Sequence, residues 1–139
     1  MKLGLEKIRE ITTGAARVEE KAEVICFYRY TKEQDERYKI RNPELHRRSL
    51  CTAGVKLCFE TDSENLFLRI KTEKVLSRSF FSVDVFVNGE ILGYLDNFAD
   101  SVIDDRYIAL QLSQGEFSKN FYLSKIKCLK NFYNIKAHS

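Results

Sequence analysis

Hydrophobic and polar positions alternate along most of this chain. In VKLCFE (55–60), apolar side chains at every second position share one face, which is the pattern of a half-buried β-strand. The segment NLFLRI (65–70) repeats the alternation. Between them lies the polar stretch TDSE, whose side chains can hydrogen-bond to their own turn. The pattern predicts a β-hairpin with Asp62 and Ser63 at its tip.

A second hairpin is predicted over FFSVDVFVNGEILGYL (80–95). Its turn is Asn88-Gly89, a strong hairpin signal because a type I′ turn needs positive φ at both positions. A two-residue loop sets a register of three cross-strand pairs on one face: Val87 with Glu90, Val85 with Leu92, and Val83 with Tyr94. Both faces carry apolar residues, so we expect this hairpin to be central and covered on both sides.

Further strands are predicted at five places: 15–20, 23–30, 106–112, 120–125 and 129–137, with a turn at Gly115. One short helix is predicted over TKEQDERYK (31–39), which opens with Thr31 and has Gln34 three residues later, a capping box. Many short strands with at most one or two short helices indicate an all-β fold, a two-sheet β-sandwich of jelly-roll type. At 139 residues, we expect a single domain spanning 1–139.

The charge balance argues against two kinds of partner. Twenty-three basic and 20 acidic side chains give a net charge of +3, without the dense basic stripe of a nucleic-acid-binding protein. No run approaches the roughly 18 apolar residues of a membrane span. The N-terminal MKLGLEKIRE carries Glu6 and Glu10 where a signal peptide has an apolar core. We therefore expect a cytoplasmic protein with no nucleic-acid or membrane partner.

The residues that bind metals are few and scattered. The cysteines follow no metal-ligand spacing and include no C-x-x-C, and the two histidines, His46 and His138, are far apart. We expect neither a metal site nor another cofactor. Two disulfides are conceivable, but the cysteines are better explained as small hydrophobic residues in strands: Cys26, Cys51, Cys58 and Cys128.

Two segments resemble catalytic or metal-binding sites. Ser63 beside Asp62 lies at a predicted turn, but a serine hydrolase also needs a histidine and an acid in reach, and the G-x-S-x-G motif is absent. His138 lies next to the chain end and His46 in a basic stretch. The acidic segment LDNFADSVIDD lacks EF-hand spacing, so a solvated loop is favoured over calcium for Asp96, Asp100, Asp104 and Asp105. We expect this chain not to be an enzyme.

Four segments together resemble one family. ICFYRYTKEQDERY, AGVKLCFETDSENLFLRI, FFSVDVFVNGEILG and GEFSKNFYLS follow one another as in the N-terminal β-sandwich domain of bacterial two-domain SGNH/GDSL hydrolases. The resemblance covers roughly residues 11 to 136. One departure is Ser124, where a proline would be expected after FYL.

The resemblance implies a partner and an activity outside this chain. In that family a jelly-roll domain precedes an α/β SGNH domain, which carries a Gly-Asp-Ser nucleophile and a late Asp-x-x-His and deacylates esters, often on carbohydrates. No catalytic residue can be carried over, because Thr61-Asp62-Ser63 lies within the accessory domain. The resemblance thus implies an accessory domain that docks on an SGNH catalytic domain of the same parent chain.

Two alternative functions stay open. The chain could be a carbohydrate-binding module, since 17 aromatic residues are available, although tryptophan is absent and core packing explains most of them. A weaker alternative is polyanion binding by a lysine-rich tail, although such lysines more often protect a sheet edge: Lys119, Lys125, Lys127, Lys130 and Lys136.

The stretch RYKIRNPELHRRS (37–49) is the predicted docking or ligand surface. The stretch contains five lysine or arginine residues and a single acidic residue, Glu44. The alternation typical of a strand is absent around Pro43, so we expect an ordered surface loop. A solvated basic loop without a role is the alternative. Arginine with tyrosine is a composition favoured at interfaces. The candidate residues are Arg37, Tyr38, Arg41, Arg47 and Arg48.

Overall fold

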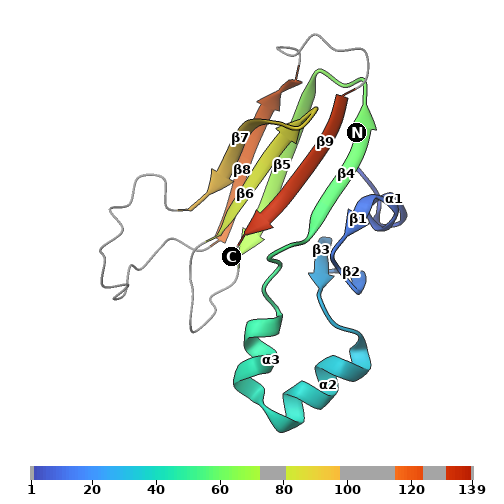
Figure 1. Ribbon diagram of the computed structural model, residues 1–139, viewed down its shortest axis with the longest axis vertical. Helices are drawn as coiled ribbons and strands as arrows, with labels where there is room; N and C mark the ends of the chain where they lie inside the picture. The colour runs from blue at the N-terminus through green and yellow to red at the C-terminus, as the bar shows by residue number, and fades with distance from the viewer. Residues whose placement is uncertain (1, 73–80, 98–114, 124–130, 139) are drawn as a thin grey trace.

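The computed structural model describes residues 2–72, 81–97, 115–123 and 131–138, and antiparallel strands dominate them (Figure 1). The described helices are α1 (Leu5–Ile11), α2 (Lys32–Arg41) and α3 (Pro43–Ser49). The described strands are β1 (Thr12–Thr13), β2 (Arg17–Lys21), β3 (Val24–Tyr28), β4 (Lys56–Thr61), β5 (Asn65–Thr72), β6 (Ser82–Val87), β7 (Glu90–Asp96), β8 (Gly115–Tyr122) and β9 (Asn131–His138). The fold is mainly β, as the alternation predicts.

Three antiparallel sheets organise the described strands. The largest has the order β1-β4-β9-β6-β7, and the pairs β2–β3 and β5–β8 form two-stranded sheets. The main core lies between the five-stranded sheet and β5–β8, where Val85 and Val87 of β6 pack with Phe121 and Leu123. In Figure 1, β5 and β8 accordingly lie behind β6 and β9. Each sheet buries one apolar face against the other, which is why the strands alternate.

A smaller cluster joins the N-terminal segment to the sheet. Ile8 and Ile11 of α1 pack with Val18 of β2, against Leu57 and Phe59 of β4. Helix α1 was not predicted from the sequence, although its apolar residues recur every three positions. This helix covers the β1–β4 end of the large sheet and places β2–β3 beside it.

The hairpin at Asn88-Gly89 is confirmed. Both turn residues have positive φ (52° and 86°), and Val87 pairs with Glu90 as predicted. The predicted register fails beyond that pair, because a bulge shifts it: Val85 pairs with Gly93 and Val83 with Leu95. Opposite Val85 the chain has Gly93, where an added Cβ would lie 3.2 Å from the Phe121 ring, so a larger side chain would be crowded there.

The expected covering of this hairpin on both sides is only partly right. Strand β6 lies between β9 and β7, with its valines buried and its other face half-buried. Strand β7 is the last strand of the sheet as described, and Ile91 and Tyr94 are exposed on it.

The predicted hairpin over 55–70 is wrong, although both strands exist. Strand β4 pairs with β1 and β9, whereas β5 pairs with β8. The polar residues 62–64 therefore carry the chain from one sheet to the other. A local sequence pattern cannot separate these outcomes, since a hairpin and a crossing between sheets both need two amphipathic strands and a polar connection.

The remaining strand predictions hold with shifted bounds. Strands β2 and β3 pair antiparallel, and β9 occupies most of 129–137. Strand β8 begins at Gly115, five residues before the predicted 120–125. The predicted strand 106–112 lies outside the described residues.

The prediction of a loop over 37–49 is wrong. The helix expected over 31–39 continues to Arg41 as α2, and α3 follows directly. Asn42 caps α3 by accepting a hydrogen bond from the backbone N–H of Leu45 (3.0 Å), and Pro43 occupies the first helical turn. Proline suits that position because its missing N–H would have no helical partner there.

Candidate functional site

Helices α2 and α3 project from one end of the sheets and carry all five predicted site residues (Figure 1). The capping box of α2 is confirmed: Thr31 Oγ1 accepts from the N–H of Gln34, and the Gln34 side chain accepts from the N–H of Thr31. With both helices capped by their own sequence, the basic residues are held on a rigid element rather than on a loop.

Helical geometry gives most of these arginines an acidic neighbour. Arg37 Nη2 lies 2.6 Å from Glu33 Oε1, one turn earlier, and Arg47 Nη2 lies 2.6 Å from Glu44 Oε2. Arg48 also contacts Glu44, at 3.3 Å. Hydrogen bonds from Arg47 hold the pKa of Glu44 below its ordinary value. In the described part of the chain, Arg41 makes no ion pair, which leaves its guanidinium free for a partner.

Apolar side chains are exposed among these charges. Ile40 is 83% exposed, and Leu45 and Leu50 are 42% and 43% exposed. Ile40 lies three residues after Arg37 and next to Arg41, so helical spacing brings these three onto one face of α2. We call the exposed arginines and aliphatic residues of α2, α3 and the C-cap of α3 the helical surface: Arg37, Ile40, Arg41, Leu45, Arg47, Arg48 and Leu50. The aliphatic members were not predicted, because the segment was interpreted as a loop, and only a helix places residues three or four positions apart on one face.

Tyr38, the fifth predicted residue, points elsewhere. It is half-buried, and its ring lies 5.2 Å from that of Tyr30, between centroids, at a tilt of 51°. Tyr38 thus packs α2 against the segment that follows β3 and does not belong to the exposed surface.

One arginine fastens α2 to the β2–β3 sheet. Arg17 of β2 donates to the Asp35 carboxylate of α2, to Glu19 Oε1 at 2.8 Å, and to the carbonyl oxygen of Tyr30 at 3.1 Å. Its guanidinium carbon also lies 3.9 Å from the centroid of the Tyr28 ring. This anchor fixes the orientation of the helical surface, and no local sequence signal reveals it because its partners lie up to 18 residues apart.

The anchor has clear electrostatic effects. Burial alone would lower the pKa of Arg17, but hydrogen bonds to Glu19 and Asp35 outweigh it and raise that pKa above the ordinary value. The hydrogen bond from Arg17 lowers the pKa of Glu19, assisted by the nearby charges of Lys32 and Lys21. Both groups therefore stay ionised near neutral pH.

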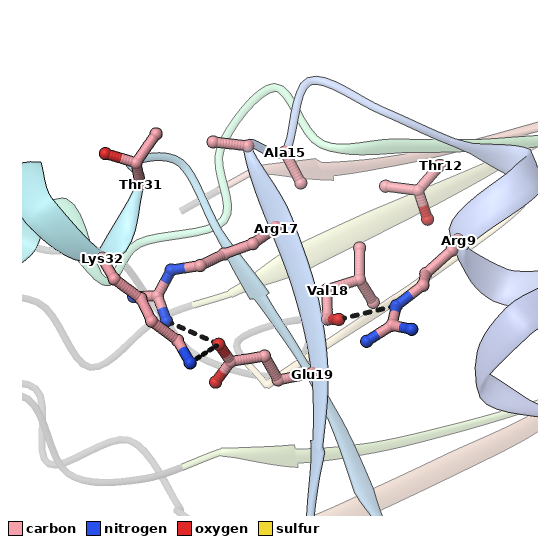
Figure 2. A pocket seen from close by; sticks show the side chains of 9 residues that line it. Arg9, Thr12, Ala15, Arg17, Val18, Glu19, Thr31 and Lys32 are labelled. Carbon is pink, nitrogen blue, oxygen red and sulfur yellow. Dashed lines mark hydrogen bonds and ion pairs between the residues drawn. The ribbon is translucent and has the colours of Figure 1, made fainter.

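Beside the anchor lies an open cleft of about 460 Å³ (Figure 2). In Figure 2 the Arg17 side chain points to Glu19, whose carboxylate also lies near Lys32. On the far side, Arg9 Nε donates to the carbonyl oxygen of Val18 at 3.0 Å. These polar groups hold α1, β2 and α2 together, so the cleft is best explained as a structural junction.

The structure does not bring the hydrolase-like residues together. Ser63 is exposed after the end of β4, and its backbone N–H donates to Thr61 Oγ1. His46 lies on α3, which precedes the start of β4, and the pairing of Lys56 with Lys136 places His138 near that same start. Six strand residues span roughly 20 Å, so the serine and both histidines lie at opposite ends of β4.

The other candidate residues have different outcomes. Among the described residues, no three His, Cys, Asp or Glu side chains group as metal ligands do. Cys26, Cys51 and Cys58 form no disulfide with one another in the described part of the chain. Of the lysine tail, Lys119 donates to the carbonyl oxygen of Tyr94 (2.8 Å). The other tail lysines in 124–130, most of the acidic segment and Cys128 lie outside the described residues.

Membrane crossing by a helix finds no support in the described part of the chain, where each helix is too short or too polar for it.

Comparisons with known proteins give one fold-level likeness. No protein-family model and no curated protein sequence matches the chain. Among solved structures, the chain is similar to the salicylyl-acyltransferase SsfX3 from a tetracycline biosynthetic pathway, with a TM-score of 0.55 and 15% identity. The likeness covers 91% of this chain but 32% of the acyltransferase chain. This chain thus has a fold also found within an acyltransferase about three times as long.

Proposed function

We propose that this chain is a non-catalytic accessory domain, a jelly-roll β-sandwich that docks on the SGNH/GDSL-type esterase domain of a longer parent protein. The observation that carries the proposal is the unequal coverage: nearly all of this chain matches about a third of an acyltransferase. A fold that occupies a minor part of a larger acyl-handling enzyme suits an accessory role. The core between the five-stranded sheet and β5–β8 is consistent with a two-layer sandwich.

The chemistry of the neighbour agrees with the family resemblance. An acyltransferase and an ester hydrolase both move an acyl group onto a nucleophile, and they differ in whether the final acceptor is another molecule or water. On the resemblance to SGNH/GDSL hydrolases and the likeness to SsfX3, we propose related reactions in the parent protein. Neither assigns a catalytic role to residues of this chain.

The helical surface is the proposed docking site. Arginine is enriched at protein interfaces, and burying an exposed aliphatic side chain beside it would remove apolar surface from water. Ile40 and Arg41 meet this description best, since the first is highly exposed and the second has no ion pair in the described chain. The excess of positive charge calls for an acidic patch on the catalytic domain.

The test uses the parent protein encoded by the gene of this chain. Replacing Arg41, Arg47 and Arg48 by alanine should loosen the association of the two domains and reduce esterase activity. A control is Lys7→Ala, which removes an exposed basic residue that is paired within its own helix, with Glu10 at 2.9 Å, as Arg47 and Arg48 are with Glu44. Domain association is measured by limited proteolysis and small-angle scattering, and activity with p-nitrophenyl acetate. Wild-type association and activity in the folded triple variant would remove the helical surface as the docking site.

A further inference from the structure

The edge of the large sheet at β7 is capped by a side chain from the other layer. The carbonyl oxygen of Tyr94 accepts a hydrogen bond from Lys119 Nζ of β8 at 2.8 Å. Val87 and Glu90 flank a two-residue turn and so form a hydrogen-bonded pair. Such pairs alternate with non-hydrogen-bonded ones, which makes Asp84 and Tyr94 a non-hydrogen-bonded pair. The backbone groups of Tyr94 therefore point away from β6, and an ammonium group occupies the acceptor that an added strand would use.

Lys119 reaches this edge from a core-facing position. It pairs with Leu68 across the β5–β8 sheet and lies between Phe117 and Phe121, which pack in the main core. Residues two positions apart on a strand share a face. Lys119 is nonetheless exposed, and its Nζ lies 5.4 Å from the centroid of the Tyr94 ring and 5.3 Å from that of Phe121. An inward-facing charge beside a sheet edge is one of the ways in which natural proteins prevent strand addition.

The bulge gives this edge an apolar outer face. Ile91 lies opposite Phe86 of β6. Tyr94 lies opposite Asp84, which is on the same face of β6 as Phe86. Residues three positions apart lie on opposite faces of a regular strand, but the extra residue of the bulge brings Ile91 and Tyr94 onto one face. Their exposed fractions are 61% and 49%.

These two residues make the edge complementary to itself. If a second copy paired its own β7 antiparallel to this one, Ile91 of each copy would lie opposite Tyr94 of the other, and both would lose exposed apolar surface. In that register the acidic residues of β7, Glu90 and Asp96, lie opposite Leu95 and Gly89 of the other copy. Like charges of β7 would therefore not meet.

We propose that Lys119 keeps this chain from pairing with a second copy through β7. Its ammonium occupies the carbonyl oxygen of Tyr94, and a paired edge would bring two such ammonium groups together, one from each copy. Without the charge, two copies form an antiparallel β7–β7 dimer in which Ile91 contacts Tyr94 of the other copy. This edge and the helical surface belong to different elements, so either proposal can fail without the other.

The test is the molar mass of the 139-residue chain, measured by analytical ultracentrifugation over a series of concentrations. Lys119→Met keeps the aliphatic stem and removes the charge. It should dimerise where the wild type is monomeric, with an association constant at least about tenfold higher. Lys119→Arg, which keeps a charged donor, should stay monomeric. Lys71→Met is the matched control, since Lys71 is also an exposed strand lysine but lies on the opposite face of the β5–β8 sheet.

A second substitution separates edge pairing from other association. Ile91→Lys, added to Lys119→Met, should restore the monomer, and amide hydrogen exchange in β7 should be slower in the Lys119→Met dimer than in the wild type. If Lys119→Met loses its fold, Lys119→Thr retains strand propensity and should give the same result. Three results would overturn the proposal: a folded variant without the charge that stays monomeric, association that Ile91→Lys does not suppress, or a wild type that already dimerises through β7.

Discussion

The Arg17–Asp35 ion pair should decide how firmly the helical surface is held, and it can be tested by a double-mutant cycle. The Arg17 side chain is 19% exposed and the Asp35 side chain 11% exposed, so this pair is largely withdrawn from water. Arg17→Met keeps the aliphatic stem but removes every donor to Asp35, Glu19 and Tyr30. The Asp35 carboxylate would then remain with little solvent and without its main partner.

The magnitude follows from that burial. Removing one partner of a fully buried pair costs about 3–5 kcal/mol. Asp35 retains some solvent and lies near the start of α2, where the helix dipole favours an anion. We therefore expect Arg17→Met to lower the free energy of unfolding by about 2–3 kcal/mol, and Asp35→Asn by about 1–2 kcal/mol.

The assay is urea unfolding of the wild type, the two single variants and the double variant at neutral pH. Because both single variants break the same contact, the double variant should be more stable than the sum of the separate losses predicts, by about 1–2 kcal/mol. Domain association in the parent protein should also weaken in Arg17→Met, since the helical surface loses its anchor while its own residues are intact. Additive losses, or a single-variant loss below about 0.5 kcal/mol, would refute the anchor.

Three further predictions concern the fold and its charges. Gly14→Ala should destabilise the chain by at least about 1 kcal/mol more than Gly54→Ala, as measured by thermal unfolding. Both glycines have positive φ, but only at Gly14 would an added Cβ meet a backbone oxygen, at 2.4 Å. Equal losses of stability in the two variants would contradict this. Gly89→Val should cost about 1–3 kcal/mol by calorimetry, from φ strain alone since the space there is open, and an unchanged melting temperature would contradict it. The lowered pKa of Glu19 means that its contribution to stability is present above its ordinary pKa of 4.5 and is lost as the pH falls through the folded-state value. Glu19→Gln should thus be less stable than wild type near pH 7, and melting curves of the two should converge in acid; a constant difference would refute this.

Local sequence signals correctly predicted the Asn88-Gly89 turn and the cap of α2, because these features depend only on residues close together in the chain. Asn88-Gly89 forms the predicted turn because positive φ at two successive residues is a property of that dipeptide. The Thr31 capping box is likewise local. The register beyond Phe86 was not predicted, since the Asn88-Gly89 signal defines the turn but does not locate a bulge further along the strands.

The failed predictions of the hairpin over 55–70 and of the loop over 37–49 have separate physical causes. The strands on either side of Asp62 and Ser63 pair with β9 and β8, distant partners that a two-strand pattern cannot name. The helix α3 has only seven residues, too few for a clear 3.6-residue period, so its signals were limited to the cap at Asn42 and to Pro43.

The site was predictable in composition but not in form. The arginines and lysine of 37–49 are exposed, as expected of a surface segment. Tyr38 is half-buried instead, because its ring packs beside that of Tyr30. Ile40 was hidden by the loop interpretation, because its role depends on lying on one helical face with Arg37 and Arg41. The anchor by Arg17 depends on tertiary contacts and has no counterpart in local sequence.

The central claim, that this chain is a non-catalytic part of an esterase, is tested most directly by measuring ester hydrolysis by the isolated chain and by its parent protein side by side. With p-nitrophenyl acetate, the parent should hydrolyse the ester, whereas the 139-residue chain should give the buffer rate. Ser63→Ala should leave both rates unchanged, because Ser63 lies at the opposite end of β4 from both histidines. Hydrolysis by the isolated chain that Ser63→Ala abolishes would contradict the account.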